Sequence, residues 1–354
     1  MIPVVEDSRR SFLRKTGLGA LGLGLSACSA REIAQPLEIM TVRGPIPADQ
    51  MGMTLPHEHL IVDFMGSGPG PSDRYDQETA FRAILPHLER LKAAGCATLI
   101  ESTPAYIGRD AAFLHRLSKA SGLHILTNTG LYGAAEDKYL PPFVYDETPE
   151  ELARRWLTEW TEGIGATGIR PGFIKSGADK GPLSEIDAKL VRAAALTHRK
   201  SGLAIAIHTS DAVGARDELR ILKEEGVGPE AFVWIHAQNA DSDVHVELAR
   251  QGVWVSLDGI NVANLDRYRD WVVNLWRENL LGRVLISHDD GWSVAESDAK
   301  EPFARLGDAN GPPFDTILSR FLPKLREAGM GPDEIHRLTV ENPSEAFSIW
   351  LRPA

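Results

Sequence analysis

The chain has 354 residues, of which 43% are hydrophobic and 25% are charged, and this composition excludes disordered, collagen-like and low-complexity proteins. Its 38 basic and 49 acidic residues give a net charge of −11, which does not favour binding to nucleic acid or to an anionic membrane surface. The two cysteines, Cys28 and Cys96, cannot form a disulfide framework.

Residues 1–28 predict a twin-arginine, lipoprotein-type signal peptide. Residues 8–14 have the sequence Ser-Arg-Arg-Ser-Phe-Leu-Arg, which resembles the motif of bacterial folded-protein export. The Gly-rich apolar run that follows is shorter than the ~20 residues needed to span a bilayer, and it ends in Leu-Ser-Ala-Cys, similar to a lipobox. We therefore expect a periplasmic protein whose only membrane contact is a lipid on Cys28. The alternative is a frayed N-terminal helix with a chance pair of arginines.

The remainder of the chain predicts a linker with short strands over residues 29–50 and one domain over residues 51–354. Apolar runs rich in β-branched residues alternate with helical patterns, such as Leu152, Trp156 and Trp160, which are spaced four residues apart. The predicted strands are Met53–Val62, Ala97–Ser102, His124–Thr129, Gly172–Ser176, Ala204–Thr209, Phe232–Ala237, Val253–Asp258 and Val284–His288.

The spacing of these strands predicts a single (β/α)₈ TIM barrel. Seven steps lead from the polar end of the first strand at residue 57 to that of the last at residue 289, roughly 33 residues per step. One βα unit takes about 30 residues. A doubly wound open sheet would favour a Gly-rich turn after the first strand, but Pro56–His59 occupies that place.

Metal-ligand residue types end several of the predicted strands. His57 and His59 are two residues apart in an extended segment, so their side chains point to the same side. His208, His236 and Asp289 each follow a very apolar strand. Because a barrel gathers the carboxyl ends of its strands on one face, these five residues predict a site for Zn²⁺ or a similar divalent ion. A His-x-His pair alone would be explained equally well by chance.

Lys175 ends the predicted strand that begins at Gly172. A lysine buried at a barrel mouth is costly unless it is neutralised or paired. One interpretation is an ion pair with a neighbouring carboxylate. The other is a carbamate formed with carbon dioxide, whose two oxygens and negative charge suit it to bridge two cations.

These residues lie in motifs that resemble the phosphotriesterase family of the amidohydrolase superfamily. The resemblance extends over about residues 38–350, with the motifs in the family's order and spacing. The similar segments are Thr41–Ile46, Gly52–Leu60, Ile107–Asp110, Thr129–Tyr132, Phe173–Lys175, His208–Thr209, Ser256–Ile260, Ser287–Asp289 and Thr339–Pro343.

The resemblance implies a binuclear metal centre with Zn²⁺ as the first expectation and Mn²⁺, Co²⁺ or Fe as alternatives. It assigns His57, His59 and Asp289 to the more buried ion, and His208 and His236 to the more exposed one. Carboxylated Lys175 would bridge both ions together with a hydroxide. Asp289 would also accept a proton, which makes Asp289 and Lys175 the implied catalytic residues. Relatives in this family also imply a homodimer.

The implied activity is hydrolysis of a small-molecule lactone, carboxylic ester or phosphotriester. Tyr132 stands where lactonases have Tyr and organophosphate hydrolases have Trp, which favours a lactone or carboxylic ester. Gly259 departs from both groups, which have Arg or His there, and Asn239 lies near the position of a family carboxylate. The alternatives are an organophosphate hydrolase and, in a different class, a metal- or ligand-binding lipoprotein without turnover.

Substrate contacts are predicted for Tyr132, Trp292, Tyr106 and Asp258. The long segment over residues 290–313 predicts a loop that overhangs the metals as a substrate lid, because loops of that length are usually functional or disordered. Residues 64–76 predict the opposite wall of the pocket. Gly259 predicts extra room beside the metals for a larger substrate.

The lipid anchor has a direct test. A Cys28→Ala variant lacks the thiol that would carry the lipid, so we expect it to be soluble in the periplasm. Fractionation of cells expressing each form, followed by immunoblotting, checks this. Retention of the variant in the membrane fraction would contradict the lipobox interpretation.

Overall fold

Short parallel strands follow one another in chain order through the computed structural model, which describes residues 37–66, 68, 70, 73–295, 303–307 and 311–354. Strands β3 to β5 form one hydrogen-bonded series, and β6 to β11 form another. These strands are β3 (Thr54–Glu58), β4 (Thr98–Glu101), β5 (His124–Leu126), β6 (Asn128–Thr129), β7 (Phe173–Ala178), β8 (Ile205–Thr209), β9 (Phe232–Ile235), β10 (Trp254–Asp258) and β11 (Val284–Ser287). The predicted signal peptide and Cys28 lie outside the described residues, so the lipid anchor stays a prediction.

Two junctions join these series into a ring. Only Thr127 separates β5 from β6, and its carbonyl oxygen accepts a hydrogen bond from Gly172 N, just before β7. At the other junction, Asp289 N donates to the carbonyl oxygen of His57 over 3.2 Å, and His59 N donates to that of Asp290 over 2.8 Å. The last strand thus lies beside the first, as a (β/α)₈ barrel requires and an open doubly wound sheet does not.

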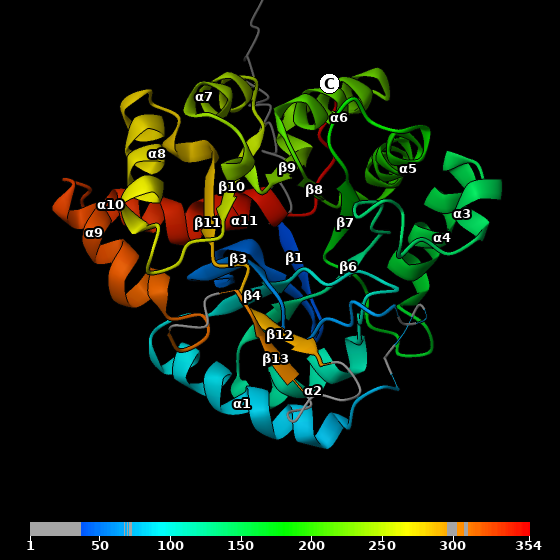
Figure 1. The fold of residues 1–354 in the computed structure, drawn as a ribbon, viewed down its shortest axis with the longest axis horizontal. Helices are drawn as coiled ribbons and strands as arrows, with labels where there is room; N and C mark the ends of the chain where they lie inside the picture. Colours follow the sequence, from blue (N-terminus) through cyan, green and yellow to red (C-terminus); the bar gives the residue numbers. More distant parts are fainter. Residues whose placement is uncertain (1–36, 67, 69, 71–72, 296–302, 308–310) are drawn as a thin grey trace, which may run out of the picture. The chain divides into compact units, whose positions relative to one another are not determined.

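One or more helices follow each barrel strand, with β5 and β6 taken together, and they cover the outside of the ring, as Figure 1 shows. The hairpin of β12 and β13 precedes the helices that follow β11. The helices are α1 (Gln77–Ala93), α2 (Ala111–Ser121), α3 (Phe143–Asp146), α4 (Pro149–Glu162), α5 (Glu185–Ser201), α6 (Ala212–Glu224), α7 (Ser242–Arg250), α8 (Leu265–Arg277), α9 (Leu322–Glu327), α10 (Pro332–His336) and α11 (Asn342–Phe347). Among the described residues, no helix is both long and apolar enough to span a membrane.

Helix α4 illustrates how the sequence directs these elements. The Thr148 side chain accepts from the backbone of Glu151, whose own side chain accepts from Thr148 N, and together they form a capping box. Leu152 and Trp156 face the core from this helix. The helix predicted from their spacing is therefore confirmed.

The interior of the barrel is filled by side chains from alternate strand positions. Ala206, Val233, Ile235 and Leu285 belong to an inner cluster that also includes Phe173. The intervening residues, such as Ile207 and Trp234, belong to the larger cluster between strands and helices. This alternation fills the interior of the barrel with packed side chains, as is typical of such barrels.

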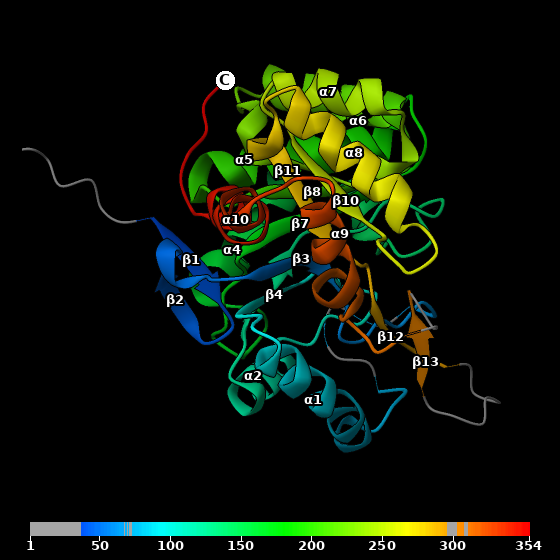
Figure 2. The same cartoon turned by 90° about the vertical axis from the view of Figure 1, so that its left-hand side faces the viewer.

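Two antiparallel pairs lie at opposite ends of the barrel strands (Figure 2). Strands β1 (Glu38–Thr41) and β2 (Gly44–Pro47) lie at the amino-terminal end, and β12 (Gly291–Val294) and β13 (Phe303–Leu306) lie at the carboxyl end. The second pair corrects the prediction of a plain loop over residues 290–313. Trp292 and Val294 are buried while Ser293 is partly exposed, an alternation too short to be recognised in the sequence.

A buried carboxylate lies at the junction between the first and last strands. Glu58 is completely buried, and its Oε1 accepts from Ser287 Oγ at 2.7 Å, His288 N at 3.0 Å and His288 Nδ1 at 2.7 Å. Its Oε2 accepts from Asp290 N at 2.9 Å. One β3 side chain therefore binds four donors at the end of β11.

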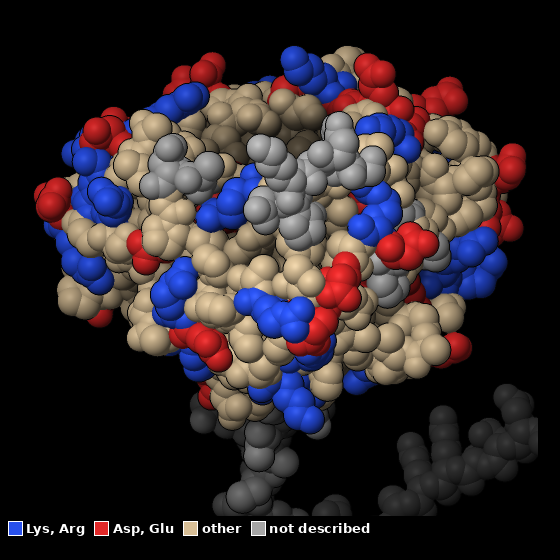
Figure 3. All heavy atoms as spheres, turned by 60° about the horizontal axis from the view of Figure 1, so that its bottom comes forward, with Lys and Arg blue, Asp and Glu red and all other residues tan. Residues whose placement is uncertain are grey.

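At the surface, basic and acidic side chains are interspersed on the face that Figure 3 shows.

We expect Glu58→Gln to destabilise the fold by about 3 kcal/mol, since it removes the charge opposite His288 and directs amide hydrogens at other donors. Denaturant unfolding, with the free energy extrapolated to water, measures the change. The exposed Glu89 of α1 supplies the control variant Glu89→Gln, which should unfold like the unaltered protein. Equal stabilities for both variants would contradict the role of Glu58.

Candidate metal centre

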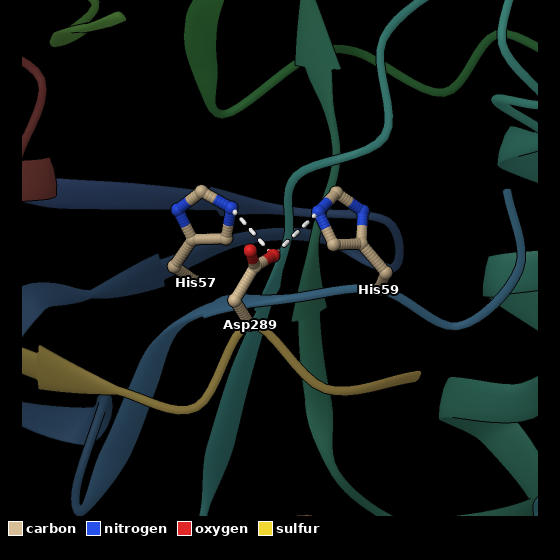
Figure 4. Close-up of side chains that lie close together, drawn as sticks. All are labelled: His57, His59 and Asp289. Carbon is tan, nitrogen blue, oxygen red and sulfur yellow. Dashed lines mark ion pairs between the residues drawn. The ribbon is translucent and has the colours of Figure 1, made fainter. Parts of the chain in front are cut away.

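Strand β3 supplies the first two candidate ligands. His57 and His59 are two residues apart, and both Nε2 atoms face the carboxylate of Asp289, which follows β11 (Figure 4). Asp289 Oδ1 lies 3.3 Å from His57 Nε2 and 3.1 Å from His59 Nε2. The ligand atoms of these three residues all lie within 4.8 Å of one another, close enough to hold one metal ion.

Two candidate ligands have a left-handed backbone. The φ angle is 61° at His236 and 58° at Asp289. For residues other than glycine this conformation costs about 1–3 kcal/mol and persists only where surrounding contacts impose it. Here His236 N donates to Asp258 Oδ1 at 3.0 Å, and Asp289 N donates to the carbonyl oxygen of His57. The strand-end backbone is thus bent at the two positions where a side chain must turn into the mouth.

The other histidines lie beside this group. The ring of His208, at the carboxyl end of β8, packs edge-on against that of His236 with centroids 4.3 Å apart. The His236 ring lies 5.2 Å from the ring of His57. All six predicted metal ligands line one cavity of about 110 Å³, namely His57, His59, Lys175, His208, His236 and Asp289. Imidazole nitrogens and carboxylate oxygens are the donors that Zn²⁺ and similar divalent ions take, so the residues fit such ions.

Lys175 lies on β7 with only 2% of its surface exposed, and its Nζ donates to the carbonyl oxygen of Ser176 at 3.4 Å. Burial lowers the pKa of Lys175 to about 8, although Asp289 and Asp258 oppose the shift. A fraction of this amine is therefore neutral near physiological pH. Gly130 allows the neighbouring strand to approach, because a Cβ there would lie 2.1 Å from the carbonyl oxygen of Lys175.

The cavity shifts the pKa values of its histidines in opposite directions. Burial lowers the pKa of His57, but the carboxylates of Asp258 and Asp289 more than offset this and raise it to about 9. Burial, together with His236 and Lys175, holds the pKa of His208 well below its usual range. The neutral His208 can therefore bind a cation directly. A metal ion that binds His57 must first displace a proton from its ring.

Oxygen atoms of Asp258 and Thr103 lie behind three of the histidine rings, in hydrogen bonds to His236 and His59 and in an ion-pair contact with His57. Asp258, at the end of β10, has Oδ1 2.6 Å from His236 Nδ1 and Oδ2 3.2 Å from His57 Nδ1. His59 Nδ1 lies 2.8 Å from Thr103 Oγ1, which donates to the buried Glu101. Partners of this kind fix the orientation of ligating imidazoles.

The prediction that Asp258 contacts substrate is wrong, because Asp258 is fully buried and is not among the residues that line the cavity. Sequence reasoning also missed the roles of Glu58 and Thr103. A ligating histidine generally needs a hydrogen-bond partner at its second ring nitrogen, and this rule could have prompted a search for such residues in the sequence.

Only one of the predicted aromatic contacts lines the cavity. Tyr132 does so, with its ring 5.2 Å from that of His208. Trp292 instead packs between His87 and Phe314, at 5.1 and 5.7 Å. Tyr106 packs against Phe143 and is not among the lining residues. Neither Trp292 nor Tyr106 is among the described residues that line this cavity, and the substrate contacts predicted for them stay predictions.

The room expected beside Gly259 is filled. Its φ is 150°, and a Cβ there would lie 2.7 Å from the Tyr268 hydroxyl oxygen and 3.1 Å from Gln238 Nε2. Gly259 therefore accommodates two neighbouring side chains rather than a larger substrate. Phe64 does line the cavity, as predicted for the wall over residues 64–76, and Leu306 of β13 lines it as well.

Comparison with known proteins agrees with this geometry. The sequence model of the phosphotriesterase family matches residues 37–347. A "phosphotriesterase homology protein" of Escherichia coli strain K12 is 30% identical, covering 84% of this chain and 99% of the relative. An "aryldialkylphosphatase" of Saccharolobus solfataricus is 27% identical over 86% and 97%. An "N-acetyltaurine hydrolase" of Danio rerio is 26% identical over 89% and 97%.

A solved structure is also similar, with a TM-score of 0.75 and 29% identity, over 88% of this chain and all of that one. It comes from work described as the molecular engineering of organophosphate hydrolysis activity from a weak promiscuous lactonase template.

The centre predicts a loss of metal when a ligand is removed. Loss of an outer hydrogen-bond partner typically costs about 10–100-fold in metal affinity, so His59→Ala should cost at least as much. Dialysis against buffered Zn²⁺ followed by elemental analysis measures the metal retained. Half-exposed His336, on α10, provides the control His336→Ala, which should retain as much zinc as the unaltered chain. Unchanged zinc in the His59 variant would contradict the site.

Proposed function

The chain belongs to the phosphotriesterase family, and on that premise we propose that it is a binuclear metal-dependent hydrolase that cleaves a lactone or a carboxylic ester. The observation that carries the proposal is the convergence of six ligand-type side chains on one cavity at the mouth of the barrel. A protein that only binds a ligand has no need for this donor set together with a proton acceptor.

We assign His57, His59 and Asp289 to one ion, and His208 and His236 to the other. Lys175 would lie between them as a carbamate. Its neutral amine nitrogen would add to the carbon of carbon dioxide and release a proton, and the lowered pKa of Lys175 favours this step. Two divalent ions held there would supply Lewis acidity toward the substrate oxygen and would lower the pKa of water.

Asp289 is the residue best placed to accept a proton from the attacking water. The Asp289 side chain is 32% exposed and lines the cavity, whereas the carboxylates of Asp258 and Glu101 are buried behind the histidines. Burial disfavours its charged form, but His57 and His59 outweigh burial and hold its pKa well below the usual range. The carboxylate is therefore ionised and reaches the substrate space.

The remaining wall of the cavity favours a neutral substrate. Its described residues include Val62, Phe64, Pro104, Ile107 and Leu306, which exclude water and offer apolar surface to an acyl or alkyl group. Tyr132 lies among them beside His208. These contacts support a lactone or ester. A neutral phosphotriester also suits such a wall, and the aryldialkylphosphatase relative makes it the second candidate.

A substrate panel tests the proposal. The purified chain is loaded with Zn²⁺, Mn²⁺ or Co²⁺ in turn. Each form is assayed on lactones whose ring substituents increase in size, on aryl esters, on an aryl dialkyl phosphate and on an N-acetyl amide. We expect the highest kcat/KM on a lactone or ester. Asp289→Asn should lower kcat about 10²–10⁴-fold, because it cannot accept the proton.

The outcomes separate the alternatives. Faster hydrolysis of the phosphate triester favours the second candidate, and cleavage of the amide alone overturns the ester assignment. Protein that holds two metal ions per chain but cleaves nothing in the panel would overturn the hydrolase proposal itself. His336→Ala is again the matched control.

A further inference from the structure

Gln238 contacts two residues of the candidate centre, Asp258 and His236, whose Nδ1 lies 3.3 Å from Gln238 Nε2. Gln238 lies in the short helical turn Ala237–Asn239, two residues after His236. Its Nε2 donates to the carbonyl oxygen of Asp258 and, at 3.1 Å, to Asp258 Oδ1. Its Oε1 accepts from Asp258 N at 3.2 Å. The amide thus binds the backbone and the carboxylate of Asp258 at once.

Asp258 in turn serves both candidate ion sites. One carboxylate oxygen lies 2.6 Å from His236 Nδ1, and the other lies 3.2 Å from His57 Nδ1. His57 and His236 belong to different ions in the proposed centre. One buried carboxylate therefore supports both rings, through a hydrogen bond to His236 and an ion-pair contact with His57.

Gly259 lies beside this arrangement. A Cβ at this position would lie 2.7 Å from the hydroxyl oxygen of Tyr268 and 3.1 Å from Gln238 Nε2, so Tyr268 would have to shift and Gln238 would be tightly packed. Gly259 and Gln238 therefore pack against each other beside Asp258.

We propose that Gln238 is a positioning residue that, through Asp258, holds His57 and His236 in register and thereby sets the affinity of the centre for divalent metal. This rests on the proposed function only in that the cavity binds metal. Without the amide, Asp258 keeps its charge but loses three hydrogen bonds, two to its backbone and one to its carboxylate oxygen Oδ1. The histidines then lose their common support.

The test uses the full chain and Co²⁺, whose visible absorption reports the ligand field. Gln238→Met keeps the length of the side chain and removes its polar atoms. We expect it to bind Co²⁺ about tenfold or more weakly in competition with a chromogenic chelator, with an altered visible spectrum at saturation. Exposed Gln251, which accepts from Lys223, provides the control Gln251→Met, which should leave both readouts unchanged.

A double-mutant cycle separates positioning from a general structural effect. Asp258→Asn should weaken Co²⁺ binding further than Gln238→Met, and combining the two should add little to Asp258→Asn alone, because Gln238 acts through Asp258. Losses that add in full would overturn the proposal, as would affinity of Gln238→Met equal to that of the unaltered chain.

If Gln238→Met does not fold, Gln238→Glu carries the test. It keeps the acceptor for Asp258 N but has no donor for the carboxylate, so Co²⁺ binding should again weaken, and unchanged affinity would overturn the proposal. The unaltered chain keeps this failure distinct from that of the proposed function. If that chain binds no Co²⁺, the metal centre is wrong, whereas tight binding by both chains refutes only the role of Gln238.

Discussion

The candidate metal centre depends on the junction at which the last barrel strand meets the first. Glu58 lies between His57 and His59 in the sequence, and its carboxylate accepts hydrogen bonds from Ser287, His288 and Asp290. The same contacts that close the ring therefore set the position of the Asp289 backbone. Closure of the barrel therefore also places the ligands, because His57 and His59 come close to Asp289, more than 200 residues later in the sequence, only where this junction forms.

The carboxylates of Asp258 and Glu101 lie behind the site, and the free-energy cost of removing them from water is part of the cost of building it. Asp258 and Glu101 are both nearly or completely buried, and burial raises the pKa of Glu101 to about 7, against the bonds it accepts from Thr103 and Leu60. Buried carboxylates are costly unless paired, and here each lies on the side of a histidine that faces away from the cavity. The cavity itself is left with imidazole nitrogens, one amine and one carboxylate. A bound cation would take the place of the positive charge that a protonated His57 provides beside Asp289.

The strands, and the convergence of the ligand-type side chains on one cavity, could be predicted because each depends on local signals. An apolar run followed by His208, His236 or Asp289 is visible in sequence, and the parallel arrangement brings these ends together. The roles of Asp258, Gly259 and Trp292 could not be predicted in this way. They depend on which residues lie opposite, such as Tyr268 beside Gly259 and Phe314 beside Trp292, and those partners are distant in sequence. The left-handed backbone of His236 likewise follows from its bond to Asp258, not from its own type.

The pairing of Gln238 with Gly259 shows what a family resemblance carries and what it leaves open. Ligands are constrained by the metal's donor preferences and by strand geometry, so they transfer position by position. Residues behind them need only hold an acceptor in place, and that can be done by different side chains in different packings. The space beside Gly259 is taken by Tyr268 and Gln238, and Gln238 also donates to Asp258. In this chain Gly259 and Gln238 thus belong to one packing arrangement beside the carboxylate that lies behind the histidines.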